Sequence, residues 1–340
     1  MKKVKIADAV GMILCHDITK IVPNEFKGRA LTKGHIIQEE DIPELLAMGK
    51  EHIYVWEDRP GTLHENDAAT RIAEAIRGPN ITIRGPEEGK CTFASDIKGL
   101  FEVNRQLLQK INSIPMVSVA TLPNNFPVNI HDKIAGARVV PLTIAEKAII
   151  QVEEVSREYG AAIRVTPYQK LKAGVVVTGS EVYKGRITDR FGPVIEEKLA
   201  YFDSPLLEKV LVTDNTDQIK TAILELKALG ADIIIVTGGM SVDPDDLTPC
   251  AIGSTGASIV TYGAPVQPGN MFMLAYLDGT VIMGVPGCSM YMKTTILDAV
   301  LPRAFAGHTL TKADFVAMGE GGFCRGCKVC RYPTCFFCRS

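Results

Sequence analysis

Two glycines, one serine and three carboxylates fall within the stretch TGGMSVDPDD, which runs from Thr237 to Asp246. The stretch directly follows the apolar run DIIIV. Glycines at such a place let backbone amides close around an anion, whereas carboxylates repel anions and hold cations or accept protons. A ligand of this loop would have to suit both kinds of residue.

Other loops with special residues follow strands in the same part of the chain. TGSE (178–181) follows the run GVVVT, Asp214 follows VLVT, and VQPGN and GVPGCSM bracket a pair of apolar runs. A single loop of this kind usually marks only a turn, because glycine and proline are common in turns. In open α/β sheets, ligands bind beyond the carboxyl ends of the strands, so the joint occurrence of these loops favours a binding site.

The elements that position these loops alternate between strand and helix from about residue 171. Continuous Val/Ile runs separated by amphipathic helices predict a parallel sheet covered on both faces. Asn215 and Gln218 resemble a capping box at the start of one helix. The runs on either side of Asp278 and Gly279 predict a hairpin, so the sheet should end mixed. A final helix is expected over 290–307.

The chain before residue 171 predicts smaller, mixed α+β domains. A helix is expected over 38–49 and a strand over 52–56, followed by a helix over 68–76 and a strand over 81–84. Near-helical apolar spacing predicts one long helix from Ile97 to Ile111, and a helix over 145–160 should end at Gly160. We therefore expect an accessory domain over 1–57, a middle α/β accessory domain over 58–170, a mostly parallel three-layer α/β domain over 171–307, and a Cys-rich tail over 308–340.

Composition narrows the class of ligand. Of the 340 residues, 37 are basic and 39 acidic, and the net charge of −2 carries no signature of nucleic-acid binding. No apolar run approaches the roughly 20 residues that cross a bilayer, and the first eleven residues do not form a secretion signal. We expect a cytoplasmic protein with a small-molecule ligand, and no nucleic-acid or membrane partner.

The ordered set VVVTGSE, VLVTDN, DIIIVTGGMSVDPDD, PVQPGNMFML and VIMGVPGCSM resembles the molybdopterin-binding domain of the molybdopterin molybdenumtransferase family. Members of that family place molybdenum on the pterin dithiolene during molybdenum cofactor biosynthesis. The resemblance covers about residues 171–307. The segments ALTKGHIIQEEDIPELLAMGKEHIYV and IAGARVVPL are similar to the family's more divergent accessory domains.

This resemblance implies a ligand with both properties, because molybdopterin carries a phosphate and a dithiolene that receives the metal from molybdate. The implied pterin-binding residues are Thr178, Gly179, Ser180, Gly238, Gly239, Ser241, Pro268, Gly269, Pro286 and Gly287. The implied catalytic carboxylates are Glu181, Asp214 and Asp246, which would accept thiol protons or orient Mg²⁺ and molybdate. The alternative is that Asp214 and Asp246 cap helices and that Glu181 is a solvated loop charge.

Three departures from the family pattern affect the metal step. Ser180 replaces an acid in the GDE motif, Gln267 and Asn270 stand where the KPGKP loop has two lysines, and Cys288–Ser289 replaces Asn-Pro. Loss of two cations weakens the attraction for molybdate. We therefore expect a molybdopterin-binding protein that inserts molybdenum as a transferase, with a non-catalytic cofactor carrier or sensor serving an apo molybdoenzyme as the alternative. Nucleotide hydrolysis is a third hypothesis, and the family's assembly implies a homodimer.

The last seventeen residues form a separate cysteine motif. Cys324, Cys327, Cys330, Cys335 and Cys338 follow the spacing C-x2-C-x2-C-x4-C-x2-C. Two-residue gaps let neighbouring thiolates converge on one metal. The spacing predicts a site for Zn²⁺ or an iron–sulfur cluster, with free thiols as the alternative. The remaining cysteines are scattered, which favours reduced thiols over disulfides.

Overall fold

The structure is a computed structural model that describes residues 1–22, 25–55 and 60–339. It divides into two compact units, one made of residues 1–95, 103–121 and 131–164, the other of residues 96–102, 122–130 and 165–340. The predicted boundary between residues 57 and 58 lies outside the described residues. Within the described ranges, no helix has both the length and the apolar character needed to cross a membrane.

The first unit begins with a small α+β module around its own apolar core. Strand β1 (Lys2–Lys5) pairs antiparallel with β4 (His52–Val55), and β2 (Ile18–Val22) pairs antiparallel with β3 (Phe26–Leu31). The predicted helix is present as α1 (Asp41–Ala47), and a short 3-10 turn, η1, spans Ile6–Asp8. The buried core of this module includes Val4, Ile6, Leu14, Leu45 and Ile53.

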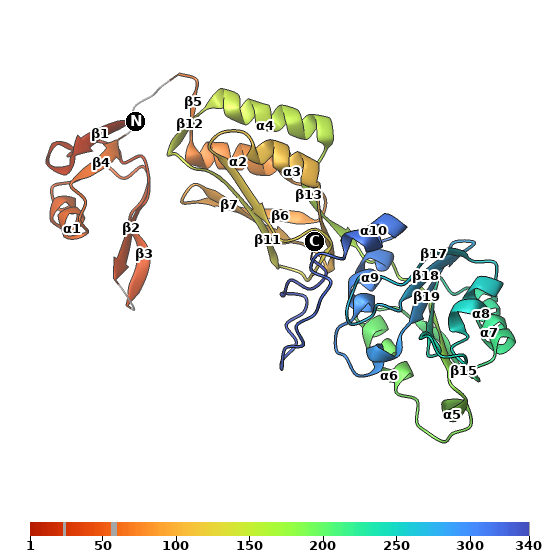
Figure 1. Cartoon of the computed structure of the whole chain (residues 1–340). Helices are drawn as coiled ribbons and strands as arrows, with labels where there is room; N and C mark the ends of the chain where they lie inside the picture. Colours follow the sequence, from red (N-terminus) through yellow and green to blue (C-terminus); the bar gives the residue numbers. More distant parts are fainter. Residues whose placement is uncertain (23–24, 56–59, 340) are drawn as a thin grey trace. The chain divides into compact units, whose positions relative to one another are not determined.

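The remainder of the first unit is a four-stranded antiparallel sheet with helices (Figure 1). The strand order is β6-β7-β11-β9, and a separate pair joins β5 to β12. The bounds are β5 Thr62–His64, α2 Glu65–Ile76, β6 Ile81–Glu87, β7 Lys90–Ser95, α3 Arg105–Asn112, β9 Val117–Thr121, β11 Lys133–Val139, β12 Thr143–Ala145 and α4 Glu146–Tyr159. Gly160, at φ 82°, ends α4 as predicted.

The predicted long helix from Ile97 to Ile111 is wrong. Residues Gly99–Val103 form strand β8, and only α3 is helical. The side chain of Asn104 accepts a hydrogen bond from the Leu107 amide and so begins the helix there. Leu100 and Phe101 are both fully buried within the strand. Their adjacency mimics helical spacing in the sequence, but tertiary pairing of β8 decides the outcome.

The second unit contains a small sheet of order β10-β8-β13 and a large six-stranded sheet. In the large sheet the order is β15-β14-β16-β19-β18-β17, with parallel pairing from β15 to β19 and antiparallel pairing of β18 and β17. The bounds are β10 Phe126–Val128, β13 Ile163–Pro167, β14 Ala173–Thr178, β15 Leu206–Val212, β16 Ile233–Thr237, β17 Ser258–Tyr262, β18 Met273–Leu277 and β19 Thr280–Val285. The predicted mixed sheet and its Asp278–Gly279 hairpin are therefore present.

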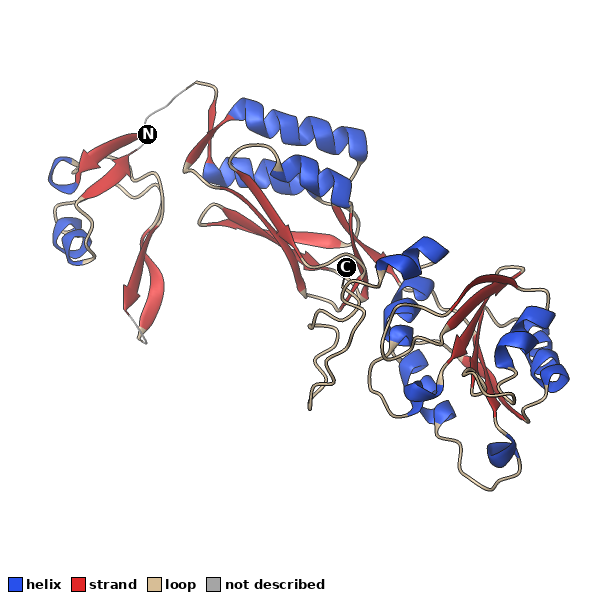
Figure 2. Ribbon diagram, viewed as in Figure 1, coloured by secondary structure: helices blue, strands red, loops and turns tan. Residues whose placement is uncertain are grey.

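Helices cover both faces of this sheet and make three layers (Figure 2). One face packs on α6 (Phe191–Ala200) and α9 (Ile296–Phe305), and the other on α7 (Thr216–Ala228) and α8 (Thr248–Ser254). Short helices α5 (Ser180–Tyr183) and α10 (Lys312–Ala317) and the 3-10 turn η2 (Gly287–Met290) complete the unit. The expected helix over 290–307 is shorter because the side chain of Thr295 caps it. The fold is α/β, as predicted.

Candidate functional site

The carboxyl ends of four parallel strands meet at one edge of the large sheet. Val177 of β14 is in register with Thr237 of β16, which in turn faces Val285 of β19. On the other side, Thr178 faces Val212 of β15. Neighbouring strands lie about 4.8 Å apart, so the four following loops sit side by side across about 14 Å. The topology thus brings the predicted loops to one edge.

Two buried threonine hydroxyls lie at this edge. Thr178 is 4% exposed and Thr237 is fully buried, and the side-chain oxygen of each has no hydrogen-bond partner among the described residues. Buried polar atoms of this kind are rare, because a missing partner costs about 1–3 kcal/mol. Thr237 was not among the residues expected from sequence. Its place at the same strand edge as Thr178 is visible only once the strands are paired.

The glycine loop packs tightly over Thr178. Gly238 and Gly239 have φ values of 89° and 55°, the left-handed region that favours glycine. A Cβ on Gly238 would lie 2.6 Å from both the carbonyl oxygen and Oγ1 of Thr178. The hydroxyl of Thr248, at the start of α8, donates to the Gly238 carbonyl at 2.8 Å. Local packing alone therefore requires glycine at position 238.

Two of the three predicted catalytic carboxylates hold loop backbone. The amide of Ser180 donates to Oδ2 of Asp214 at 2.8 Å, and the amide of Asp243 donates to Oδ2 of Asp246 at 3.1 Å. Asp214 does not cap α7, because the side chain of Asn215 does so. Glu181 is exposed within α5. The structure therefore ties Ser180 to Asp214 across two loops, whereas the Glu181 side chain faces solvent.

Tyr262, at the end of β17, is a neighbour of this loop that the sequence patterns did not reveal. Its hydroxyl donates to the carbonyl oxygen of Met240 at 3.2 Å and approaches that of Ser241 at 3.4 Å. Burial raises the pKa of Tyr262, and the negative charge of Asp246 adds to that rise. Tyr262 therefore holds the segment that carries the exposed Ser241 and senses the Asp246 charge.

The two Pro-Gly loops lie at the same edge but have different surroundings. Gly269, at φ 116°, faces the start of α9, where a Cβ would meet Cγ2 of Ile296 at 2.6 Å. The carbonyl of Pro268 accepts the Ile296 amide at 3.3 Å. Pro286 is buried and Gly287 is exposed at the start of η2. Packing against α9 alone accounts for glycine at position 269.

The cysteines of the tail do not form a metal site as arranged. Cys324, Cys335 and Cys338 pack against the core of the second unit, whereas Cys327 is exposed and the thiol of Cys330 lies 3.0 Å from Oγ1 of Thr294. Among the described residues, no three His, Cys, Asp or Glu side chains converge on a cation position. This holds for the acidic loops as well as for the tail.

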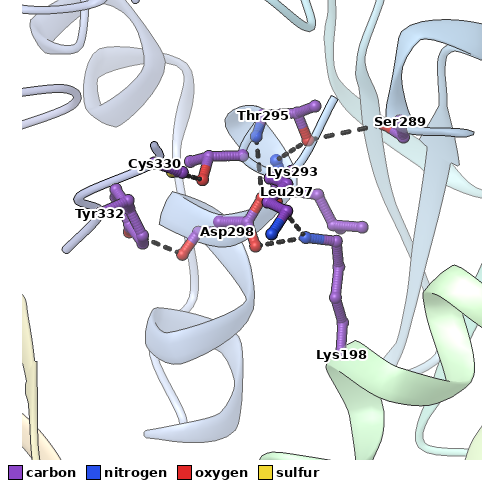
Figure 3. A network of polar contacts seen from close by, with 9 residues as sticks. Lys198, Ser289, Lys293, Thr295, Leu297, Asp298, Cys330 and Tyr332 are labelled. Carbon is purple, nitrogen blue, oxygen red and sulfur yellow. Dashed lines mark hydrogen bonds and ion pairs between the residues drawn. The ribbon is translucent and has the colours of Figure 1, made fainter. Parts of the chain in front are cut away.

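A cavity next to the second Pro-Gly loop was also missed by the sequence patterns. It has a volume of about 590 Å³ and lies between α6, the segment from Ser289 to Thr294, α9 and the tail. Lys198, Asp298, Cys330 and Tyr332 line it, and Figure 3 shows Lys198 reaching Asp298, with Tyr332 and Cys330 on the tail side. None of the predicted pterin-binding or catalytic residues lines this cavity.

Family comparisons give two matches along the chain. Residues 174–306 match a family described as "Probable molybdopterin binding domain", and residues 3–57 match one described as "Domain of unknown function (DUF8806)". A CinA-like protein of Mycobacterium sp. (strain MCS) is 37% identical over 81 residues, which are 24% of this chain and 19% of the relative. The chain thus spans about a fifth of the length of the curated relatives it matches.

The solved structures that match this chain are shorter than it is. MoaB of Thermus thermophilus, a molybdopterin biosynthesis enzyme, is 20% identical, with a TM-score of 0.33, over 41% of this chain and 98% of that one. CinA of Thermoplasma acidophilum is 17% identical, with a TM-score of 0.34, over 38% and 95%. The loops at the carboxyl edge all fall within the family match. Residues 174–306 therefore form an α/β domain that matches the family of probable molybdopterin-binding domains.

Proposed function

We propose that residues 171–307 bind molybdopterin at the carboxyl edge of the large sheet, and that the chain acts in molybdenum cofactor biosynthesis. The observation that carries this proposal is that two strand-end hydroxyls are buried and unpartnered: that of Thr178, which packs against the Gly238–Gly239 turn, and that of Thr237, which directly precedes the turn. Hydroxyl donors beside a glycine turn suit the phosphate of the pterin, because both offer hydrogen bonds to oxyanions. The match of this segment to probable molybdopterin-binding domains supports the same ligand.

The proposed step is insertion of molybdenum, with molybdate as substrate. Asp214 and Asp246 support it, since each uses one carboxylate oxygen to hold loop backbone and lies beside the glycine turn or the neighbouring strand end. A carboxylate fixed in this way can accept a proton from a dithiolene thiol. Glu181 and the loops of Pro268–Gly269 and Pro286–Gly287 belong to the same proposal.

A carrier or sensor of the finished cofactor is the second candidate. The loss of both loop lysines, at Gln267 and Asn270, favours it, because molybdate then meets fewer cations. The name CinA-like, carried by the curated relative, does not refer to molybdenum insertion. The two candidates share the same pterin site and differ only in the metal step.

The proposal also includes Mg²⁺ at the acidic loops, Zn²⁺ or iron at the tail, and a homodimer. Mg²⁺ at the acidic loops, and Zn²⁺ or iron at the tail, would each require side chains to move, since no three ligating groups converge among the described residues. A homodimer is proposed from the family resemblance alone. Light scattering at micromolar concentration tests it, and a monomer of 36.9 kDa would contradict it.

The test separates pterin binding from insertion. Molybdopterin affinity is measured for the unmodified chain and for the Thr178→Val/Thr237→Val double variant, which keeps the side-chain shape but removes both hydroxyls. We expect at least a tenfold loss of affinity, about 1.4 kcal/mol. Insertion is then measured by reconstitution of an apo molybdoenzyme after incubation with molybdate. Unchanged affinity in the folded double variant would remove the edge as the pterin site, and binding without insertion would leave the carrier function.

A further inference from the structure

The cysteine tail is docked on the second unit rather than free of it. The amide of Gln267 donates to the Gly322 carbonyl at 2.8 Å, and the amide of Cys324 donates to the Gln267 carbonyl at the same distance. Phe337 is 1% exposed within the core that also holds α9. The hydroxyl of Tyr332 donates to the Asp298 carbonyl at 2.9 Å. The tail is therefore packed against the second unit and can form part of the wall of a binding site.

The tail forms one wall of the cavity of about 590 Å³ described above, a volume within the usual range of about 300–1,000 Å³ for small-molecule sites. The tail contributes Cys330, Tyr332 and Pro333, and the opposite wall comes from α6. Every lining residue belongs to the second unit. The site thus exists because the tail packs against the α/β domain.

Lys198 lines the cavity, and Figure 3 shows its polar contacts. Its ammonium group donates to Oδ1 of Asp298 at 2.5 Å and to the Lys293 carbonyl at 3.1 Å. The Lys198 side chain is only 13% exposed and that of Asp298 17%. An ammonium group has three donors, so one N–H remains for an acceptor on a ligand. The other oxygen of Asp298 is used by the Thr295 amide.

The charges that line the cavity cancel. Lys198 and Lys293 stand against Glu197 and Asp298. A charged ligand would gain no net attraction, and a partly buried ion would lose its hydration. An uncharged ligand with a single strong acceptor fits this arrangement best.

The remaining walls are aromatic and thioether. Phe202 is 6% exposed and already stacks on Phe305 at a centroid distance of 4.2 Å, so the ring surface that faces the cavity comes from Tyr201, Tyr291 and Tyr332. Tyr332 lies on the tail side, and Met290 and Met292 come from the segment after β19. Aromatic faces stack on flat rings, and methionine adapts to irregular ligand edges. These walls suit a planar ring system.

We propose that this tail-walled cavity binds an uncharged bicyclic heteroaromatic ring with a ring carbonyl, the chemistry shared by free pterins and guanine. The carbonyl accepts the remaining N–H of Lys198, and the ring lies against the aromatic walls. The two sources differ in their second ring and are separated below. This site uses none of the residues proposed to hold molybdopterin at the sheet edge, so it stands or falls independently of that function.

The experiment titrates the full chain with pterin (2-amino-4-oxopteridine) by its own fluorescence, and with guanosine by calorimetry. A matched ligand, 2,4-diaminopteridine, keeps the rings but lacks the carbonyl. We expect saturable binding of pterin or guanosine, and at least tenfold weaker binding of the diamino compound. Pterin binding alone identifies a pterin as the ligand, and guanosine binding alone identifies a nucleobase. No saturable binding of either overturns the proposal.

Variants locate the site. Lys198→Met removes the donor, and Val194→Trp fills the cavity from α6 without changing charge; each should weaken binding at least tenfold. Lys220→Met, on α7 against the opposite face of the sheet, is the matched control and should bind as the unmodified chain does. Thr178→Val/Thr237→Val should also leave this binding unchanged, even if it abolishes molybdopterin binding. Circular dichroism checks folding, and binding that survives in a folded Lys198→Met or Val194→Trp variant places the ligand elsewhere.

Discussion

The backbone amide of Ser180 donates a 2.8 Å hydrogen bond to Oδ2 of Asp214, and so ties the loop after β14 to the loop after β15. The bond gives Asp214 a structural task that is independent of any metal chemistry. An acidic residue at this position can therefore act through its shape, through its charge or through both. Substitutions that change one property at a time can separate these contributions.

Asp214→Asn keeps an oxygen that accepts the Ser180 amide but removes the charge, whereas Asp214→Ala removes both. If the carboxylate acts in the metal step, the Asn variant should lose at least tenfold in insertion and keep its molybdopterin affinity. The Ala variant should lose affinity as well, because a loop amide is left without its partner. Affinity is measured by titration and insertion by reconstitution. Full insertion by the Asn variant would show that Asp214 only holds the Ser180 loop in place.

Gly238→Ala should destabilise the fold more than Gly239→Ala does. The new Cβ at position 238 would meet the backbone carbonyl of Thr178 at 2.6 Å, whereas at position 239 it would meet the Thr248 hydroxyl at 2.9 Å, and a side chain can move. The left-handed backbone adds about 1–2 kcal/mol in each case. Urea unfolding measures the difference. Gly239→Ala should also weaken molybdopterin binding at least tenfold, and unchanged affinity there would argue against backbone contact with the ligand.

Asp246→Asn should lower the pKa of Tyr262. Burial is the larger cause of the raised pKa, and the Asp246 charge adds to it, so removing that charge lets the phenol ionise at lower pH. Spectrophotometric titration of the phenolate, with Tyr262→Phe subtracted to isolate one tyrosine, measures the change. The control Asp243→Asn should leave this titration unchanged, since Asp243 is not a cause of the shift. An unchanged pKa in Asp246→Asn would mean that the two side chains are farther apart than the structure places them.

The thiols of the metal-free protein should react with alkylating reagents in an order set by burial. Burial raises the pKa of Cys338 to about 12 and that of Cys15 to about 11, so at pH 8 only about one Cys338 thiol in ten thousand is ionised. The exposed Cys327 and Cys250 should be labelled first. Mass spectrometry of the time course gives the order. Early labelling of Cys338 would show that the tail is not docked.

The same raised pKa values make stability depend on alkaline pH. Folding favours the protonated thiols, so their contribution is present below the unfolded pKa of about 8.5. It is lost as pH rises through the folded values of about 11 and 12, because the unfolded chain ionises first. The free energy of unfolding should therefore fall between about pH 9 and the folded pKa of about 12. A Cys15→Ala/Cys338→Ala variant should show a shallower fall, and an equal slope would contradict the assignment.

Metal content distinguishes two arrangements of the tail. As docked, the tail should carry no bound metal in anaerobically purified protein, and a thiol reagent should count all five tail cysteines after unfolding, since Cys330 contacts Thr294 and no metal-ligating cluster forms among the described residues. Near-stoichiometric zinc or iron by elemental analysis would instead show that the tail cysteines bind a metal, as their spacing predicts, and that the tail rearranges to do so. Cys330→Ser and Cys335→Ser then tell which thiols bind it.

Sequence patterns predicted the α/β domain well because its strands are continuous apolar runs and its loops carry glycine and proline at fixed places. The Asn215 cap on α7, the Gly160 end of α4 and the Asp278–Gly279 turn are all local signals, and each is present. The error at Ile97–Ile111 arose because Leu100 and Phe101 fit both a helix stripe and a strand buried on both faces. Only the pairing of β8 with β10 and β13 resolves that ambiguity.

The sequence predicted which loops form the site, but not which side chains contact one another there. A loop position can be assigned from a strand that ends, but the unpartnered hydroxyl of Thr237 depends on which strands become neighbours. Lys198 and Asp298 are one hundred residues apart, and the capping box that Asp298 forms with Thr295 carries no signal of Lys198. Their pairing follows from α6 and α9 packing on the same face. Nor does cysteine spacing reveal whether a tail gathers a metal or packs against a core.

The tail is held to Gln267 through backbone hydrogen bonds. Both the N–H and the carbonyl of Gln267 are taken by Gly322 and Cys324, while its side chain is exposed. The identity of the side chain is thus decoupled from the docking of the tail, and the absence of a lysine there is not a consequence of the tail's presence. A cation restored at position 267 would face solvent beside the sheet edge with the tail still in place, so the electrostatics of the edge can change without altering the architecture that surrounds it.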